Sequence, residues 1–396
     1  METPNTSLIS GGTQPRYQIA ILGPTATIHI GALQATLAIR ASELSPDLPS
    51  LIGFMDAAET LVRHPKSPVV GVYFGGSTPK ADDLAAINSL LASSSTIIPV
   101  VNRLDGYQAQ VPVELHRING TQTESSDPGL EAIANLVLEN LGLIRKTRRL
   151  FVSYRRDEAS PEALQLRHAL DECGYDVFLD THSVAKGDDF QQVLWQRLAD
   201  SDIVVVLDTP GFMERRWTKE ELAQAAAMTI GLVQVVWPSA KPVRYSDLCE
   251  RIYVEDADFK EPNGFTSQTL SNIIRTIEQL RARSLAARHD NLVREFCDAA
   301  ASVHIRATVQ PERYITADVK AGTLVAIPAV GVPDAALFHT ANARFPTDNG
   351  ECQLVAMIYD QRGLSPAWLT FLDWLDTHLP VKTIRITAVA YKLSSL

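Results

Sequence analysis

The stretch Ile203-Val204-Val205-Val206-Leu207 is an uninterrupted run of apolar, mostly β-branched residues. β-branched residues favour strands, and a strand that is apolar at every position suits the centre of a parallel sheet with helices on both faces. Similar short apolar runs lie on either side of it, separated by helical patterns, at Leu150–Tyr154, Val177–Leu179 and Leu232–Val236. The middle of the chain is therefore predicted to be a parallel α/β domain. Between its first two strands, Ser160 as cap, Pro161 at the first position and Gly174 at the end predict a helix over 161–173.

Three sequence blocks follow the strands of this region in a fixed order. They read Phe151-Val152-Ser153-Tyr154-Arg155-Arg156, then Val177-Phe178-Leu179-Asp180-Thr181-His182-Ser183-Val184-Ala185-Lys186-Gly187-Asp188-Asp189-Phe190, then Arg216-Trp217-Thr218-Lys219-Glu220-Glu221-Leu222. Together they resemble the Toll/interleukin-1 receptor (TIR) family: its box after the first strand, its BB loop, and its Trp-x-x-x-Glu-Leu helix start. The resemblance covers about 149–283 and implies a flavodoxin-like parallel sheet with helices on both faces. Thr209 and Arg216 stand where the family usually has a serine and a small polar residue.

The resemblance is to the bacterial NAD-hydrolysing branch, in which this glutamate cleaves NAD, so Glu221 is the predicted catalytic residue. The pyridinium of NAD is already a cationic leaving group, so the site must mainly stabilise an oxocarbenium-like ribose, which a carboxylate can do. A second interpretation is structural, because Thr218-x-x-Glu221 also reads as a capping box.

The resemblance also implies a substrate-binding set, formed by Tyr154, Arg155, Arg156, Asp180, Lys186, Gly187, Phe190 and Trp217. Tyr154 and Arg155 would shape the nicotinamide and ribose pocket, while Arg156 would contact a phosphate. The alternatives are ion pairs of these arginines with Asp157, Glu158 or Asp180, and a core-anchoring role for Phe190.

Several classes of site find no support in the sequence. No G-x-G-x-x-G motif occurs, so NAD is expected as a substrate, with no cofactor, and no zinc-protease or serine-hydrolase motif is present. The four cysteines are scattered, which predicts reduced thiols and no metal site. The net charge of −10 argues against nucleic-acid binding, and no apolar stretch is long enough for a membrane, so a cytoplasmic location is expected.

The pattern along the chain predicts three folded regions. Residues 1–15 read as a disordered tail, 16–144 as an α/β domain that is flavodoxin-like or a degenerate TIR-like copy, 149–285 as the TIR domain and 290–396 as a smaller α/β domain. In the first region, strands are expected at Tyr17–Leu22, Leu51–Phe54, Val69–Phe74 and Ile97–Val101, and helices at Asp56–Arg63, Lys80–Ala92 and Gly129–Leu141. The basic run 145–149 is interpreted as a solvated linker.

In the last region, a helix is expected at Leu292–Ala301, then strands at Leu324–Ile327, Leu354–Tyr359 and Ile384–Val389, with a helix at Pro366–Leu375. Trp368, Phe371 and Trp374 recur at helical spacing, which predicts that they pack in the core.

The leading functional hypothesis is a regulated antiphage effector that depletes NAD and gives linear or cyclic ADP-ribose. Its partners would be NAD, other TIR domains through the BB loop, and a sensor protein or small signal acting on the flanking domains. Two alternatives remain: a non-catalytic TIR scaffold, and a deoxyribosyltransferase-like enzyme that uses a free nucleoside.

Overall fold

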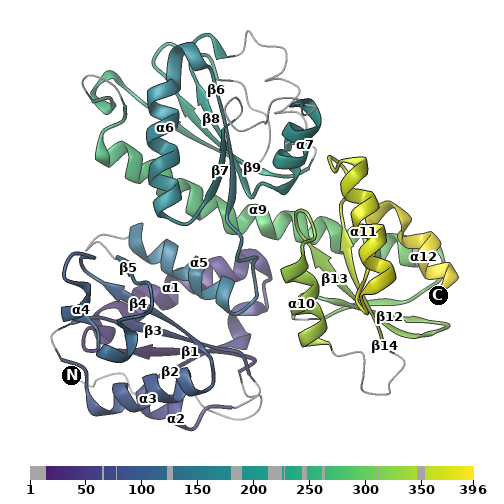
Figure 1. Ribbon diagram of the computed structural model, residues 1–396, viewed down its shortest axis with the longest axis horizontal. Coiled ribbons are helices and arrows are strands. Elements are labelled where there is room, and N and C mark those ends of the chain that lie inside the picture. The colour runs from purple at the N-terminus through teal and green to yellow at the C-terminus, as the bar shows by residue number, and fades with distance from the viewer. Residues whose placement is uncertain are drawn as a thin grey trace. The chain divides into compact units, whose positions relative to one another are not determined.

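A computed structural model of the chain describes residues 15–64, 67–76, 78–122, 128–179, 190–212, 225–226, 228–242, 248–260, 264–310, 312–345 and 353–396. The chain divides into two compact units, residues 1–141 and 142–396. The first unit holds one five-stranded sheet and the second unit holds two (Figure 1). Every helix in the described ranges is too short or too polar to span a bilayer.

The first unit is a parallel sheet in the order β2-β1-β3-β4-β5, which is the flavodoxin-like order. Its elements are β1 (Tyr17–Leu22), α1 (Ala26–Leu44), β2 (Ile52–Met55), α2 (Ala57–Leu61), β3 (Val69–Phe74), α3 (Ala81–Ala92), β4 (Thr96–Val101), α4 (Tyr107–Gln110), β5 (Thr121–Gln122) and α5 (Pro128–Asn140). The strands and helices expected here are present. The sequence pattern does not predict α1, because this helix also carries Ile28 and Ile39 on its exposed side and so lacks a single apolar stripe.

The second unit begins with a parallel sheet in the order β10-β9-β8-β6-β7. Its elements are β6 (Arg149–Tyr154), α6 (Arg156–Glu172), β7 (Asp176–Leu179), α7 (Phe190–Asp200), β8 (Ile203–Asp208), β9 (Gly231–Val236) and β10 (Cys249–Tyr253). β8 lies in the middle with every residue buried, which confirms the prediction of a central strand. The edge strand β10 is not predicted, because only part of it is apolar.

The two faces of this sheet have separate apolar cores. On one face, Val152, Val205 and Val233 pack with α6 and with α9 (Ser267–Ser302). On the other face, Phe151 and Val206 pack against α7 together with Phe212 and Ala225. Side chains that alternate along β8 therefore belong to different cores, as the pleat of a strand requires.

The start of α6 differs from the prediction. The helix begins at Arg156, and its geometry is interrupted at Ala159, where φ is −143° and ψ is 23°. The Ser160 hydroxyl does not cap a new helix but donates to the carbonyl oxygen of Arg156 at 2.7 Å. The predicted end is confirmed, because Gly174 follows the helix with φ of +80°, a conformation that glycine adopts without steric cost.

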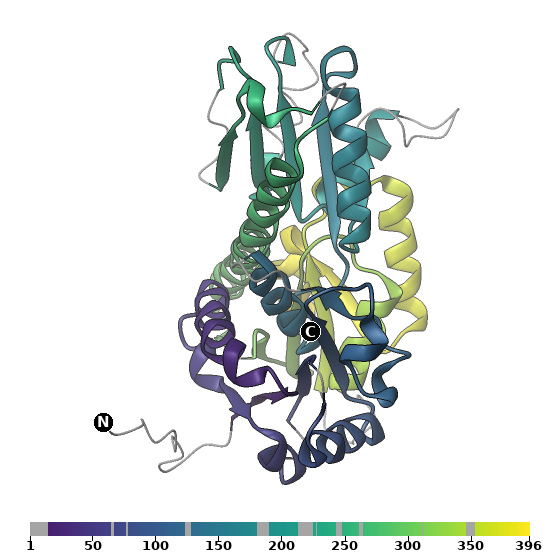
Figure 2. The same cartoon turned by 90° about the vertical axis from the view of Figure 1, so that its left-hand side faces the viewer.

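The second unit ends in a mixed sheet, in which β11 (Ala307–Val309), β12 (Ile315–Val319) and β13 (Gly322–Ala329) are antiparallel. β14 (Gln353–Tyr359) and β15 (Lys382–Arg385) continue it in parallel with β13. Helices α10 (Ala335–Arg344) and α11 (Pro366–His378) cover one face. The other face packs on α9 and on α12 (Val389–Ser395), as the green and yellow helices of Figures 1 and 2 show.

Helix α11 has apolar side chains on two sides. On its inner side, Leu372 has no exposed surface, and Leu369 packs against the same core of the mixed sheet. On its outer side, Phe371 and Trp374 are 39% and 55% exposed, so the prediction that these two aromatic residues lie in the core is wrong. One helix face already fills the contact with the sheet. Trp368 is half-buried at the edge of that core.

Helix α9 joins the two sheets of this unit as one continuous helix of 36 residues. The helix predicted at 292–301 is only its last part. The strand predicted at 384–389 is wrong beyond Arg385, because a 3-10 turn over Ile386–Ala388 leads into α12. The β-branched sequence favours a strand locally, but turning into a helix buries Ile386 and Val389 against α9.

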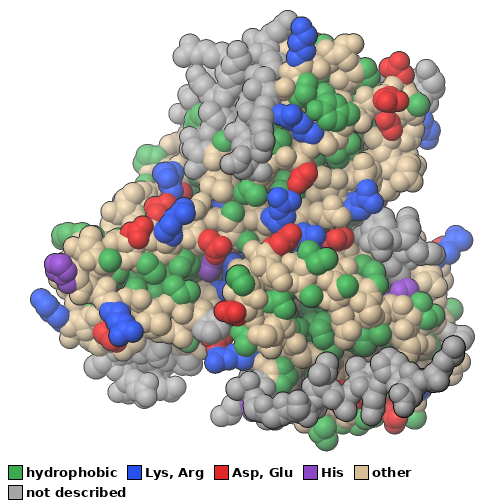
Figure 3. Space-filling model, turned by 180° about the vertical axis from the view of Figure 1, so that it is seen from behind, with side chains coloured by type: hydrophobic (Ala, Val, Ile, Leu, Met, Phe, Trp, Pro, Cys, Tyr) green, Lys and Arg blue, Asp and Glu red, His purple; other side chains and the backbone are tan. Residues whose placement is uncertain are grey.

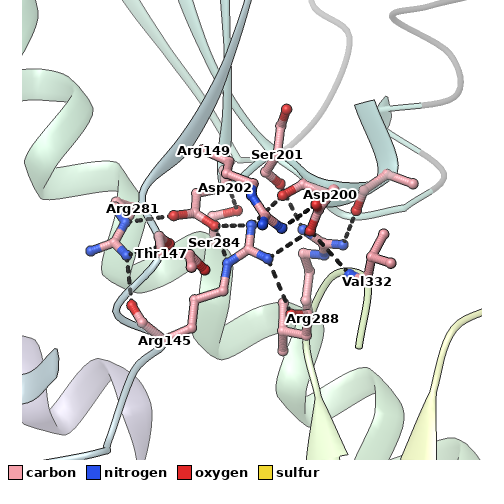
Figure 4. Close-up of polar contacts among 12 residues, drawn as sticks. Arg145, Thr147, Arg149, Asp200, Ser201, Asp202, Arg281, Ser284, Arg288 and Val332 are labelled. Atoms are coloured by element: carbon pink, nitrogen blue, oxygen red, sulfur yellow. Dashed lines mark hydrogen bonds and ion pairs between the residues drawn. The ribbon is translucent and has the colours of Figure 1, made fainter. Parts of the chain in front are cut away.

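A cluster of four arginines and two aspartates lies where α9, the parallel sheet of the second unit and the mixed sheet meet (Figure 4). Its members, called the arginine–aspartate cluster below, are Arg145, Arg149, Asp200, Asp202, Arg281 and Arg288. The side chain of Asp202 has no exposed surface and accepts from Arg145 Nε at 2.5 Å and from Arg281 Nε at 2.7 Å. Burial acts to raise the pKa of Asp202, but the charges of Arg145 and Arg281 together outweigh it, so that its pKa lies below the ordinary value.

Asp200 connects the same cluster to the mixed sheet. It pairs with Arg145 at 3.0 Å and with Arg149, and its Oδ1 accepts from the backbone N–H of Val332 at 3.0 Å. Arg288 donates to the carbonyl oxygens of Ser201 and Ala199, and burial, with the neighbouring charge of Arg145, lowers the pKa of Arg288 to about 10.

The interpretation of residues 145–149 as a solvated linker is therefore wrong for Arg145 and Arg148, whereas Lys146 and Thr147 are exposed. The side chains of Arg145 and Arg148 are only 8% and 7% exposed, and Arg148 pairs with Glu278 of α9 at 2.7 Å. Charge runs are usually solvated, and nothing local in the sequence shows that the carboxylates of Asp200, Asp202 and Glu278 surround this one.

Candidate functional site

The carboxyl end of β6 is bound to the turn that follows β8. Arg155 Nη1 donates to the carbonyl oxygen of Gly211 at 2.9 Å and pairs with Glu158 at 3.0 Å. Glu158 Oε2 in turn accepts from the N–H of Gly211 at 3.1 Å. A Cβ atom on Gly211 would lie 1.7 Å from Arg155 Nη1, so a larger residue here would displace the ends of the Arg155 and Glu158 side chains. Arg155 and Glu158 thus bind the carbonyl oxygen and the N–H of Gly211, respectively.

This turn leads into the segment that carries the predicted glutamate. Phe212, directly after Gly211, is buried in the apolar core beside α7, and Ala225 is buried in the same core. The segment 213–224, which includes Trp217 and Glu221, lies outside the described residues. Asp180, Lys186 and Gly187 also lie outside them. Phe190 is described only as the first residue of α7.

The other predicted binding residues have different surroundings. Tyr154 is 1% exposed and packs in the core beside α6, on the opposite face of the sheet from Phe212 and Ala225. Arg156 is exposed in the first turn of α6. Among the described predicted residues, Arg155 contacts Gly211, two residues before the undescribed segment of Glu221. The alternative ion pair of Arg155 with Glu158 is confirmed.

A line of polar side chains, which the sequence motifs do not predict, crosses three strands next to this turn. Asp208 ends β8 and accepts from Gln234 Nε2 of β9 at 2.7 Å. Gln234 Oε1 accepts from Arg251 Nε of β10 at 3.1 Å. Gln234 has no exposed surface, and Asp208 is 2% exposed. A carboxylate is thus held in the core at the carboxyl end of a central strand, where open α/β sheets bind ligands.

Burial raises the pKa of Asp208, although the hydrogen bond from Gln234 and the charge of Arg251 act in the opposite direction. Next to it, the hydroxyl of Thr209 is buried and has no hydrogen-bond partner within the described ranges. Buried carboxyl groups with shifted pKa values are concentrated at functional sites. A charged residue directly after the apolar run 203–207, at the end of β8, is the signal that could have identified Asp208.

The Asp208→Asn variant is expected to be at least as stable as the wild type at neutral pH. Asparagine keeps an oxygen that accepts from Gln234 and does not require a buried charge. The pKa of Asp208 is higher in the folded state than its ordinary value of 3.8. Its carboxyl group therefore contributes to the free energy of unfolding at low pH, and this contribution is lost as the pH rises from about 3.8 through the folded-state pKa. The free energy of unfolding of the variant, relative to the wild type, should therefore increase over this pH range. Urea titrations at several pH values measure it. A variant clearly less stable at pH 7 would show that the fold needs the charge.

Charged side chains of both signs are interspersed on the face shown in Figure 3. Within the described ranges, no group of three or more His, Cys, Asp or Glu side chains is arranged to hold a metal ion. Cys173, Cys249 and Cys297 are free thiols.

A scan against protein-family models matches residues 150–265 to the TIR domain. This match confirms the expected family for the central region, and the chain thus carries a TIR domain at these residues. A comparison with curated proteins gives no match.

Solved structures also give matches of low similarity. The TIR domains of the activated Roq1 resistosome, which directly recognises the pathogen effector XopQ, align with 18% identity and a TM-score of 0.22, over 36% of this chain and 83% of that one. The C-terminal domain of glucosamine-fructose-6-phosphate aminotransferase from Francisella tularensis aligns with 12% identity and a TM-score of 0.20, over 68% and 84%. A protein from Silicibacter pomeroyi DSS-3, described as a phosphosugar isomerase, aligns with 11% identity and a TM-score of 0.18, over 70% of this chain and 87% of that one.

Proposed function

We propose that the TIR domain at 150–265 is an NAD glycohydrolase that cleaves the bond between nicotinamide and ribose. The observation that carries this proposal is the position of Glu221, four residues after Trp217 and directly before Leu222, inside a segment that the TIR family model matches. The enzymatic branch of the family, which the sequence blocks resemble, has its glutamate at this place.

The reaction needs a cation-stabilising group more than a strong nucleophile. The bond between ribose C1′ and the nicotinamide nitrogen breaks, and its electron pair stays on that nitrogen, which makes the leaving group neutral. The positive charge moves to the ribose, where the carboxylate of Glu221 would stabilise it. Water then adds to C1′ and loses a proton, so that NAD⁺ and water give ADP-ribose, nicotinamide and a proton. Attack on C1′ by a nitrogen of the adenine ring would give a cyclic product instead.

The described residues support a site at this edge of the sheet. Arg155 and Glu158 hold the turn at Gly211, from which the chain continues to Glu221. Because they bind the protein backbone, we assign both to positioning of that segment. Asp208 supplies a second buried carboxyl group three residues before Gly211.

We further propose that cleavage is restrained until a trigger such as phage infection reaches the flanking domains, because unrestrained NAD loss would harm the cell. The sensing partner would be a protein or a small signal. TIR domains of neighbouring copies would complete the site through the BB loop, around Lys186 and Gly187.

The proposal is tested by incubating the purified full-length chain with NAD and measuring nicotinamide and ADP-ribose by liquid chromatography. Infected-cell lysate is added to one set of samples and uninfected lysate to the other, each with a matched sample lacking the protein. Nicotinamide release that exceeds both controls is expected. Release of a base from a deoxynucleoside, with NAD untouched, would favour the deoxyribosyltransferase alternative. No turnover of either substrate in any sample would favour the scaffold.

The Gly187→Pro variant is expected to remove the dependence of turnover on protein concentration. If a second TIR domain completes the site, turnover per molecule rises with concentration, because association follows mass action. Proline fixes φ and lacks an N–H donor, which should disturb the BB loop at this position. Initial rates over a roughly hundred-fold dilution series measure the effect. Constant turnover per molecule in the wild type would contradict assembly.

A further inference from the structure

The two loops that follow β13 and β14 contact the TIR domain. β13 and β14 are neighbouring parallel strands, so both loops leave the same edge of the mixed sheet. The first loop binds the last residue of α7, because the N–H of Val332 donates to Asp200 Oδ1 at 3.0 Å. The second loop, residues 360–365, places Gly363 against Ala199 of the same helix. The carboxyl edge, at which open α/β sheets bind ligands, is here in contact with α7.

Gly363 lies between two elements of the TIR domain. A Cβ atom at this position would lie 3.0 Å from Ala199 Cβ, 3.3 Å from the carbonyl oxygen of Trp195 and 3.3 Å from Met228 Cε. The first two residues belong to α7, whereas Met228 is buried in the apolar core on the same face of the sheet. Gly363 also has a φ of +82°, which glycine adopts without steric cost. Space and backbone geometry therefore both favour glycine here.

Both of these elements adjoin the sequence blocks of the predicted NAD site. α7 begins at Phe190, which is the last residue of the BB-loop block. Met228 stands seven residues after Glu221. An α-helix moves as a rigid body, because backbone hydrogen bonds link each turn to the next. Helix shifts of about 1–2 Å are common in regulated proteins, and a shift at the C-terminal end of α7 would be passed on to Phe190.

The C-terminal end of α7 is held from more than one side. Arg288 of α9 donates to the carbonyl oxygen of Ala199 at 2.6 Å, and Arg145 pairs with Asp200 at 3.0 Å (Figure 4). Cationic groups are favourable at a helix C-terminus, because the helix dipole is negative there. The mixed sheet adds the N–H of Val332 to the same carboxylate. The position of α7 therefore depends on the mixed sheet as well as on the TIR domain.

We propose that the mixed sheet holds α7 and Met228 in place through the loop 360–365, with Gly363 seated between them, and that this contact restrains the TIR site. The inference rests on the proposed function for the identity of the restrained reaction. NAD cleavage is held low in the resting chain, so the arrangement that the contact stabilises is the resting one. A trigger that moves this loop or α11 would release α7, and turnover would rise.

Hydrogen exchange of the full chain tests the contact without NAD. Gly363→Ala adds a methyl group that displaces Ala199 or Met228 by a few tenths of an ångström. Amides at 192–200 and 228–230 are expected to exchange at least about fivefold faster than in the wild type, which is the lower end of typical coupling between sites.

Gly174→Ala is the matched control for Gly363→Ala. Gly174 has a nearly equal φ of +80°, but a Cβ atom there would meet no atom of the described residues within 4 Å. The control should therefore carry the same backbone strain and leave exchange at 192–200 and 228–230 at the wild-type rate. Unchanged exchange in the Gly363→Ala variant, or an equal increase in both variants, would overturn the proposal.

Nicotinamide release tests the restraint itself. In uninfected lysate, Gly363→Ala should raise the rate at least about fivefold, whereas Gly174→Ala should leave it unchanged. A wild type that responds to infected-cell lysate, beside a Gly363→Ala variant with the same resting rate, would overturn the proposal. If no chain cleaves NAD in any lysate but exchange in α7 responds to Gly363→Ala, the contact holds and the proposed function fails.

A reversible disulfide tests the same contact with the opposite sign. Disulfides join Cβ atoms roughly 3.5–4.5 Å apart, and the separation between positions 199 and 363 is 3.0 Å. The double variant Ala199→Cys/Gly363→Cys is oxidised, its bond is mapped by mass spectrometry, and desalted infected-cell lysate is added. Turnover should be at least about fivefold lower than after reduction of the same chain. Oxidised wild type controls for the native cysteines. Equal triggered rates before and after reduction would overturn the proposal.

Discussion

The Glu221→Gln variant is expected to release nicotinamide from NAD at least about 100-fold more slowly than the wild type, because loss of one preorganised electrostatic group typically costs this much. Glutamine has nearly the same shape but no negative charge with which to stabilise the oxocarbenium-like ribose. It can still serve in a capping box with Thr218, so the melting temperature should stay close to that of the wild type. The measurement is the initial rate of nicotinamide release at saturating NAD.

Glu220→Gln is the matched control for this prediction. It removes the same charge one position earlier in the run and changes the net charge equally, but it does not stand four residues after Trp217. We expect Glu220→Gln to keep most of the activity. Equal turnover by the Glu221→Gln variant and the wild type would remove Glu221 from the mechanism, and loss of activity only in the Glu220→Gln variant would move the assignment by one residue.

The Asp202→Asn variant should lower the free energy of unfolding by about 3–5 kcal/mol, as expected when one member of a buried ion pair is removed. Asp202 is the carboxylate between Arg145 and Arg281, and neither its side chain nor that of Arg281 has exposed surface. Asparagine removes the negative charge beside the buried Arg281 and leaves Arg145 paired with Asp200. Urea titration of the full chain, followed by tryptophan fluorescence, measures the change.

The pH dependence of this loss has a definite sign. The folded-state pKa of Asp202 lies below its ordinary value of 3.8. The carboxylate therefore contributes to the free energy of unfolding above pH 3.8, and this contribution is lost as the pH falls through the folded-state pKa. The difference between the variant and the wild type should therefore be largest near neutral pH and shrink in acid.

Asp171→Asn is the control for Asp202→Asn, because Asp171 pairs with Arg167 at 3.6 Å with both side chains more than 40% exposed. An exposed pair of this kind contributes about 0–1 kcal/mol. Equal effects of the two variants would show that the arginine–aspartate cluster does not hold the two sheets and α9 together.

The sequence by itself determined the features that depend on local pattern. The β-branched run at 203–207 fixed the central strand, because a strand that is apolar on both sides is stable only under two layers of helices. The glycine at 174 determines where α6 ends, because glycine adopts the positive φ of this position without steric cost. The spacing of the three blocks was enough to identify the TIR domain that the family model matches at 150–265.

Only the tertiary structure decided which distant side chains meet. The side chains of Arg145 and Arg148 in the basic run are buried because the carboxylates of Asp200, Asp202 and Glu278 converge on them from other elements. Asp208 is a candidate site residue because Gln234 and Arg251 form a polar line with it across neighbouring strands. Arg155 is assigned a positioning role because it binds Gly211 together with Glu158. The outward position of Phe371 and Trp374 likewise depends on which helix face meets the sheet. Periodicity shows that a helix has an apolar side, but the buried or exposed state of each residue is set by contacts between elements far apart in the chain.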